Sequence, residues 1–115
     1  MPHFVIEYAE EVERQIDVAE LLRITYQVGA SSGLMEPADI KVRARAYKYY
    51  KMAGIKDTFV HTTIFLLAGR TDEQKEKLSI ALRSEQANLM PGVTAISIDI
   101  RDMNNIAYKK RLLPG

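Results

Sequence analysis

The first pattern along the chain is an alternation of apolar and polar positions directly after Pro2. A period of two residues is typical of a β-strand with one buried face. Proline lacks the amide hydrogen that a ladder needs, so Pro2 fits only at the start of such a strand. We therefore predict a strand over residues 2–8, with its two faces made by Phe4, Ile6 and Tyr8 and by His3, Val5 and Glu7.

A helical pattern follows this strand. Asp17 stands three residues before Glu20, as in a capping box, and apolar residues then recur at helical spacing from Val18 to Val28. Gly29 is the predicted end of this helix, because glycine readily adopts the conformation that closes a helix. The next ten residues, 30–39, contain Ser, Gly and Pro and predict a loop.

A second alternating segment runs from residue 40 to residue 47 and predicts a long strand. Its side chains differ sharply between the two faces. One face is apolar and the other is basic, the members being Ile40, Val42, Ala44 and Ala46 on the first and Lys41, Arg43 and Arg45 on the second. Strand alternation points all three cations the same way, which makes them candidates for binding an anion.

The second half of the chain repeats this order. Turn-forming residues around Ala53, Gly54, Lys56 and Asp57 precede an apolar, β-branched segment at 58–67, which predicts a strand. Thr71 and Gln74 have capping-box spacing and predict the start of a second helix. Its apolar stripe consists of Leu78, Ala81, Leu82 and Leu89. Pro91-Gly92 predicts its end, and a strand is predicted over residues 93–100.

The element order is therefore β-α-β repeated twice, which indicates an α/β fold and an internal duplication. We expect parallel strands joined by right-handed crossovers to form a four-stranded sheet, with both helices on one face. All 115 residues form one domain in this prediction, with halves at about 1–57 and 58–115. The other sheet face stays uncovered by helices. It should have a mixed apolar and polar character, with apolar side chains left over on it (Phe4, Ile6, Ile64 and Ile96 or their alternates). Burying this face against another copy predicts an oligomer.

Composition narrows the classes of function. Sixteen basic and fifteen acidic residues give a net charge of +1, which argues against a nucleic-acid or membrane partner. The chain has no cysteine, no signal-like segment and no long apolar span, so we expect a soluble cytoplasmic protein without disulfides. Its two histidines lie far apart, so we expect no metal centre and interpret both as packed or surface side chains.

Pro2 is the first candidate for chemistry. Removal of Met1 would leave a secondary amine at the start of the chain. A free α-amino group titrates at about 7.7–8.0, and burial beside cations disfavours its protonated form. A nitrogen with a pKa close to neutrality is a suitable general base. The simpler interpretation is that Pro2 is a common second residue that permits removal of Met1.

Two segments resemble a known superfamily. Residues 69–75, Gly-Arg-Thr-Asp-Glu-Gln-Lys, resemble the signature of the 4-oxalocrotonate tautomerases, and residues 2–7, Pro-His-Phe-Val-Ile-Glu, resemble the start of the 5-carboxymethyl-2-hydroxymuconate isomerases of that superfamily. Residues 50–53 and 59–62 are also similar to the latter. The resemblance covers most of the chain as far as the second predicted helix and fades after about Leu89.

This resemblance implies a cofactor-independent isomerase of aromatic-compound catabolism, built as a homotrimer of tandem β-α-β units. Its substrate would be a small 2-hydroxymuconate-type dienol that carries carboxylates, and Pro2 would be the general base. Arg70 matches the superfamily's functional arginine. The planar guanidinium suits a carboxylate, and its charge would disfavour a protonated Pro2. The simpler interpretation of Arg70 is a loop arginine near a helix start.

Each half of the chain retains only part of the expected motif. The first half has Pro2 but carries Ala9-Glu10-Glu11-Val12 where Gly-Arg would stand, and the second half has Gly69-Arg70 but no proline near residues 58–60. One complete site would need both halves, either within one chain or across a subunit boundary.

Lys41 and Arg43 are predicted substrate-binding residues, but here the sequence departs from the superfamily's pattern. Lys41 stands where an arginine is expected, and Arg43 matches a basic residue two positions later. A lysine is a point charge without the fork of an arginine. Either the substrate is held differently or Arg43 takes this task; a solvated strand face is the simpler alternative for both.

Other functions stay open at this stage. Tyrosines interleave with basic residues at 41–51, as in sheets that stack nucleic-acid bases, but the net charge argues against that function. The proline and arginine would also suit dehalogenation or decarboxylation. A non-catalytic oligomer is a further alternative, favoured if Met1 is retained. The segment 104–115 is apolar enough to be an oligomer arm.

Overall fold

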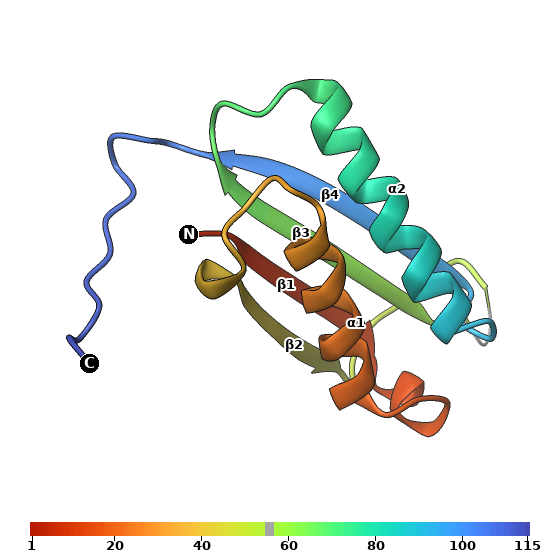
Figure 1. Cartoon of the computed structure of the whole chain (residues 1–115). Helices are drawn as coiled ribbons and strands as arrows, with labels where there is room; N and C mark the ends of the chain where they lie inside the picture. Colours follow the sequence, from red (N-terminus) through yellow and green to blue (C-terminus); the bar gives the residue numbers. More distant parts are fainter. Residues whose placement is uncertain (55–56) are drawn as a thin grey trace.

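The computed structural model describes residues 1–54 and 57–115. Four strands form one sheet, and two helices lie side by side across one of its faces (Figure 1). The elements in chain order are β1 (His3–Ala9), η1 (Glu10–Arg14), α1 (Val18–Ser31), η2 (Pro37–Asp39), β2 (Lys41–Tyr47), β3 (Phe59–Leu67), α2 (Asp72–Leu89) and β4 (Ala95–Met103). The predicted α/β architecture is confirmed.

The sheet has the strand order β2-β1-β3-β4. Each half of the chain is a parallel β-α-β unit, as the sequence predicted, because β1 pairs with β2 and β3 pairs with β4 in the parallel direction. The two units join through an antiparallel pairing of β1 with β3, in which His3 lies opposite Phe65. The start of β1 therefore lies beside the end of β3.

The alternation in β1 has the predicted phase. Phe4, Ile6 and Tyr8 are buried, whereas His3, Val5 and Glu7 are only partly buried on the opposite face. Of the two sets of side chains predicted for the uncovered face, the first does not lie there, because Phe4, Ile6 and Ile64 are fully buried in the core. Their alternates occupy that face.

The open face of the sheet has a mixed apolar and polar character, as expected. Cross-strand pairing builds rows of side chains across it. Two of these rows are Arg43, Val5, Thr63 and Asp99, and Arg45, Glu7, His61 and Ser97. Charged and hydroxyl groups are thus interspersed with Val5 and the neighbouring Phe65, so this face is not a continuous apolar surface.

Helix α1 continues past its predicted end. Gly29 is buried inside the helix, which ends at Ser31. A methyl group at Gly29 would lie 2.8 Å from Cζ of Phe4 and 3.3 Å from Cδ1 of Ile40. Glycine is therefore required here for close packing of the helix on the sheet, and the sequence alone did not distinguish this role from that of a helix stop.

Gly29→Ala is expected to lower the free energy of unfolding by about 1–3 kcal/mol, because the added methyl group overpacks the contact with Phe4. In an unobstructed helix the same change would increase stability. Urea unfolding monitored by circular dichroism measures the difference. Gln27→Ala, on the exposed side of α1, is the control, and a Gly29→Ala variant as stable as the parent would contradict the packing argument.

Helix α2 begins as predicted and packs with part of its predicted stripe. The Thr71 side chain accepts from the Gln74 amide and the Gln74 side chain accepts from the Thr71 amide, so the capping box is present. Leu78 and Leu82 are buried, but Ala81 is exposed. Neither helix in the described residues is long and apolar enough to span a membrane.

Strand β4 lies further along the chain than predicted, at Ala95–Met103 in place of 93–100. Thr58 and Thr94 exchange hydrogen bonds through their amides and hydroxyls, and this pairing occupies the residues before the strand. The shift carries the chain three residues beyond Ile100, to the same sheet edge as the end of β3. In the predicted turn before β3, Lys56 lies outside the described residues.

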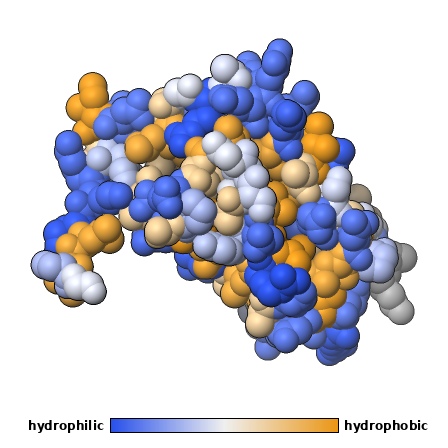
Figure 2. Space-filling view, in the orientation of Figure 1, coloured by the Kyte–Doolittle hydropathy of each residue, from blue (hydrophilic) through white to orange (hydrophobic). Residues whose placement is uncertain are grey.

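The helical side of the molecule is largely hydrophilic. Figure 2 shows apolar side chains there in separate patches among polar ones, without a continuous apolar band. The C-terminal segment projects from the body at the left of the same view. Its apolar residues are exposed: Ile106 by 83%, Leu112 by 60% and Leu113 by 78%.

Candidate active site

Four chain segments meet at one edge of the sheet. These are the starts of β1 and β2 and the ends of β3 and β4 (Figure 1). The Lys41 amide donates to the Pro2 carbonyl at 3.1 Å, and the Ala68 amide donates to the Met103 carbonyl at 3.2 Å. The antiparallel centre of the sheet thus brings the N-terminal and Gly69-Arg70 segments to the same edge within one chain.

The chain's amino terminus lies in an electropositive environment. Partial burial lowers the pKa of the Met1 amine below its ordinary value of 8.0, and the positive charges of Lys110, Arg70 and Lys41 lower it further, while Asp39 opposes them. Pro2 itself is buried. Pro2 is the adjacent residue, so removal of Met1 would place the terminal amine on a buried position next to this one.

Arg70 is held by backbone carbonyl groups. Its Nε and one terminal nitrogen donate to the Leu34 carbonyl at 3.2 and 2.6 Å, and its other terminal nitrogen donates to the Leu67 carbonyl at 2.9 Å. A guanidinium has five N–H donors, so one remains on each terminal nitrogen. The side chain is therefore fixed in place and retains two donors for a carboxylate.

Lys41 and Arg43 are both exposed on β2, but they occupy different places relative to the amine. Lys41 is one of the cations that lower the pKa of the terminal amine. Arg43 instead donates to Nδ1 of His3 at 3.2 Å. The structure therefore brings Lys41 and Arg70 close enough to the amino terminus to affect its amine, whereas Arg43 is bonded to His3.

His3 has a defined tautomer in this arrangement. Arg43 can only donate, so Nδ1 of His3 accepts and its hydrogen lies on Nε2, which is 2.9 Å from the Tyr108 hydroxyl. Burial lowers the pKa of His3, and Arg43, Lys41 and the terminal amine lower it further. His3 is thus a neutral, hydrogen-bonded side chain at the border of the site.

Three residues of this region were not predicted from the sequence. Asp39 and Lys110 act on the terminal amine through their charges, and Tyr108 is hydrogen-bonded to His3. Asp39 ends the 3-10 turn before β2, and the other two lie in the C-terminal segment. The adjacent basic residues Lys109, Lys110 and Arg111 were the only available signal. No periodic pattern connects them to the N-terminus, because the contact depends on where β4 ends.

Polar side chains further along the sheet are satisfied by one another. Glu7 accepts a hydrogen bond from the Tyr47 hydroxyl, and Glu11 accepts one from Tyr50 at 2.7 Å. Glu7, whose role the sequence did not decide, is therefore a paired structural carboxylate. Tyr50 also packs edge-on against Phe59, with ring centroids 5.3 Å apart. These partners leave Tyr47 and Tyr50 poorly placed to stack nucleic-acid bases.

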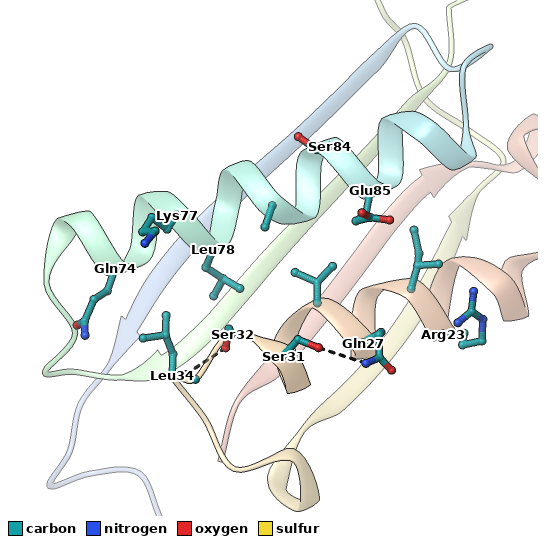
Figure 3. A pocket seen from close by; sticks show the side chains of 14 residues that line it. Arg23, Gln27, Ser31, Ser32, Leu34, Gln74, Lys77, Leu78, Ser84 and Glu85 are labelled. Atoms are coloured by element: carbon teal, nitrogen blue, oxygen red, sulfur yellow. Dashed lines mark hydrogen bonds between the residues drawn. The ribbon is translucent and has the colours of Figure 1, made fainter.

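A groove of about 860 Å³ lies elsewhere, between α1 and α2 (Figure 3). Leu34 and Leu78 lie at one end of it, and Arg23 and Glu85 lie toward the other. Neither Pro2 nor the cations around the terminal amine line this groove. The groove is therefore separate from the group of cations at the sheet edge.

The described residues contain no group of three potential metal-ligating side chains that could hold an ion. The groups at the sheet edge are instead an amine, several cations and hydrogen-bond donors. Such a set suits a small anionic molecule and proton transfer by the amine.

Comparison with known families decides the classification. The model of the 5-carboxymethyl-2-hydroxymuconate isomerase family matches residues 2–111. The chain belongs to this family. It is therefore an enzyme of the isomerase class with a tautomerase fold. No curated protein sequence matches it.

Solved structures show the same fold at low sequence identity. A 5-carboxymethyl-2-hydroxymuconate isomerase from Deinococcus radiodurans R1 superposes with a TM-score of 0.84 at 23% identity, covering 96% of this chain and 88% of the other. A 5-carboxymethyl-2-hydroxymuconate delta-isomerase has a TM-score of 0.82 at 17% identity, with 97% and 88% covered. The wild-type asymmetric trimer of F6 fused 4-OT has a TM-score of 0.73 at 18% identity, with 94% and 91% covered.

Proposed function

We propose that this isomerase uses the amine of Pro2 as a general base on a 2-hydroxymuconate-type dienol, such as 5-carboxymethyl-2-hydroxymuconate. One observation carries the proposal. Burial and three cations lower the pKa of the Met1 amine, next to Pro2, at the edge where Arg70 has two N–H donors that no other described residue uses. A neutral amine beside anion-binding groups is the arrangement that a carboxylate-bearing acid–base substrate requires.

In the proposed reaction, the neutral Pro2 nitrogen removes the proton from the 2-hydroxyl group of the dienol. The oxygen's electron pair forms the carbonyl, the double bonds shift along the conjugated chain, and the distal carbon takes up the proton from the prolinium. Atoms and charge are conserved and the amine is regenerated neutral. Neither an oxidant nor a cofactor is needed for this isomerisation.

Arg70 and Lys41 hold the substrate's carboxylates in this mechanism. Arg70 is fixed by its carbonyl partners and offers two donors to one carboxylate, which also draws electron density toward the forming carbonyl. Lys41 provides the second cation beside the amine. Arg43 donates to His3 and acts on the site through it.

We also propose that the enzyme is a homotrimer. The trimeric F6 fused 4-OT has this fold. In the present protein the open sheet face carries Val5 and Phe65 among polar side chains, and the C-terminal segment exposes apolar residues. Contact between subunits would cover both surfaces.

The test is an ultraviolet assay with 5-carboxymethyl-2-hydroxymuconate and with 2-hydroxymuconate, using protein whose mass confirms removal of Met1. We expect ketonisation of at least one substrate and its loss in protein that carries an additional residue before Pro2. Absence of turnover of both by correctly processed, folded protein would reject the proposal and direct attention to other proline-based chemistry, such as dehalogenation, or to a non-catalytic oligomer.

A further inference from the structure

Three side chains form a directed hydrogen-bond chain that leads from β2 to the C-terminal segment. Arg43 donates to Nδ1 of His3 at 3.2 Å, and Nε2 of His3 then carries the hydrogen and donates to the Tyr108 hydroxyl at 2.9 Å. The direction is fixed, because a guanidinium has no acceptor and a neutral imidazole has one donor and one acceptor.

These two hydrogen bonds do not use the hydroxyl hydrogen of Tyr108. Its oxygen accepts from His3, and among residues 1–54 and 57–115 no other side chain or carbonyl is hydrogen-bonded to it. Tyr108 is partly buried, and its ring meets that of His3 edge-on with centroids 6.0 Å apart. This hydroxyl group is held by His3 and has a hydrogen available for an acceptor such as a carboxylate.

The position of Tyr108 is set by a hydrogen-bonded turn, although most of the following segment projects from the body (Figure 1). The Asn104 side chain accepts from the amides of Ile106 and Ala107 at 2.9 and 2.8 Å, and the Tyr108 amide donates to the Asn104 carbonyl at 3.0 Å. Asn105 donates to the Ala68 carbonyl at 3.1 Å. The turn is therefore fastened to the loop that carries Arg70.

The same segment supplies a cation to the site. Of the charged neighbours, Lys110, two residues after Tyr108, has the largest effect on the pKa of the terminal amine. His3 directly follows Pro2, and its ring is hydrogen-bonded to Tyr108. Tyr108 is therefore linked to the residue next to the proposed base, and it stands two residues before a cation that acts on the terminal amine. A carboxylate bound beside the amine is the acceptor that this arrangement suits.

We propose that Tyr108 is a substrate-binding residue that donates its hydroxyl hydrogen to a carboxylate of the substrate, and that His3 and Arg43 are positioning residues that orient this hydroxyl. The inference rests on the proposed function, since that function requires a carboxylate at this edge. It makes the C-terminal segment a part of the substrate site, in addition to any role between subunits.

Tyr108→Phe tests this directly because it removes the hydroxyl and keeps the ring against His3. We expect KM for the dienol to rise about tenfold or more while kcat changes by less than about threefold, as for loss of a hydrogen bond to a charged group. Tyr49→Phe, at an 85% exposed tyrosine, is the matched control. Equal KM values for parent and Tyr108→Phe would overturn the inference.

A binding measurement separates this inference from the proposed reaction. Adipate, a dicarboxylate that cannot isomerise, is titrated calorimetrically into parent, Tyr108→Phe and Tyr49→Phe. About tenfold weaker binding by Tyr108→Phe alone supports the inference even where the parent has no isomerase activity. An active parent whose Tyr108→Phe variant binds adipate and turns over the dienol unchanged rejects the inference and leaves the proposed function standing.

The positioning role of His3 has its own readout. In ¹⁵N NMR spectra, the His3 ring should titrate below its ordinary pKa and show a protonated Nε2 in its neutral form. His3→Ala should raise KM in the parent but have no further effect in Tyr108→Phe, because the two residues act through one hydrogen bond. Additive effects of the two substitutions on KM would show that His3 does not act through Tyr108.

Discussion

Pro2→Ala is expected to lower kcat for dienol ketonisation about 100-fold. The variant keeps an α-amine but loses the ring that fixes the nitrogen and the higher basicity of a secondary amine, and general-base catalysis contributes about 10²–10⁴-fold. An extra residue before Pro2 removes the amine from this position, so kcat should fall by the whole contribution of general-base catalysis. Steady-state kinetics on mass-verified protein measures both.

The matched control for this experiment is Pro91→Ala, an exposed proline beyond the end of α2. It should retain parental kcat. Because the amine acts in its neutral form, kcat/KM of the parent should rise with pH through the amine's pKa and then level off. Burial and the surrounding cations lower the pKa of the chain's terminal amine, so this rise should come at a lower pH than for an exposed amine of the same type. A Pro2→Ala variant with parental kcat would show that another group is the base.

Arg70→Ala is expected to lower kcat/KM by about 10²–10³-fold, the range seen when one donor to a developing charge is removed. It should also shift the pH profile. The positive charge of Arg70 lowers the pKa of the terminal amine, so its removal raises that pKa and moves the rise in kcat/KM to higher pH. The profile of kcat/KM against pH reports both effects.

Arg70→Lys separates charge from geometry. It should keep the parental pH dependence and still lose substrate affinity, because an ammonium lacks the planar fork of the guanidinium. Arg83→Ala, at an exposed arginine of α2, controls for loss of a surface charge. Thermal unfolding checks the lost bonds to the Leu34 and Leu67 carbonyls. An Arg70→Ala variant with parental kcat/KM and pH profile would exclude Arg70 from the site.

Local patterns predicted the elements of this fold well. The alternation around Phe4 and Ile6 and the capping box at Thr71 depend on residues within one strand or one turn, so the sequence contains them directly. Gly29 was misinterpreted because its role depends on Phe4, a residue 25 positions earlier that the helix meets only after packing.

Local motifs indicate only part of the candidate site. Pro2 and Arg70 are found through motifs, but the antiparallel pairing that brings their segments together is a property of the whole sheet. Tyr108 and Lys110 carry no local signal of their place beside the N-terminus. Their position depends on the end of β4, which lies three residues beyond its predicted limit.

The antiparallel joining of two similar units gives the sheet two opposite edges with equivalent backbone arrangements. At the edge opposite Pro2, the residue before β3 is Thr58, an internal residue whose amide donates to the Thr94 hydroxyl. A peptide nitrogen is not basic, so duplication of the unit does not duplicate the chemistry. In the proposed mechanism each polypeptide therefore contributes one active centre, and an assembly contains as many centres as subunits.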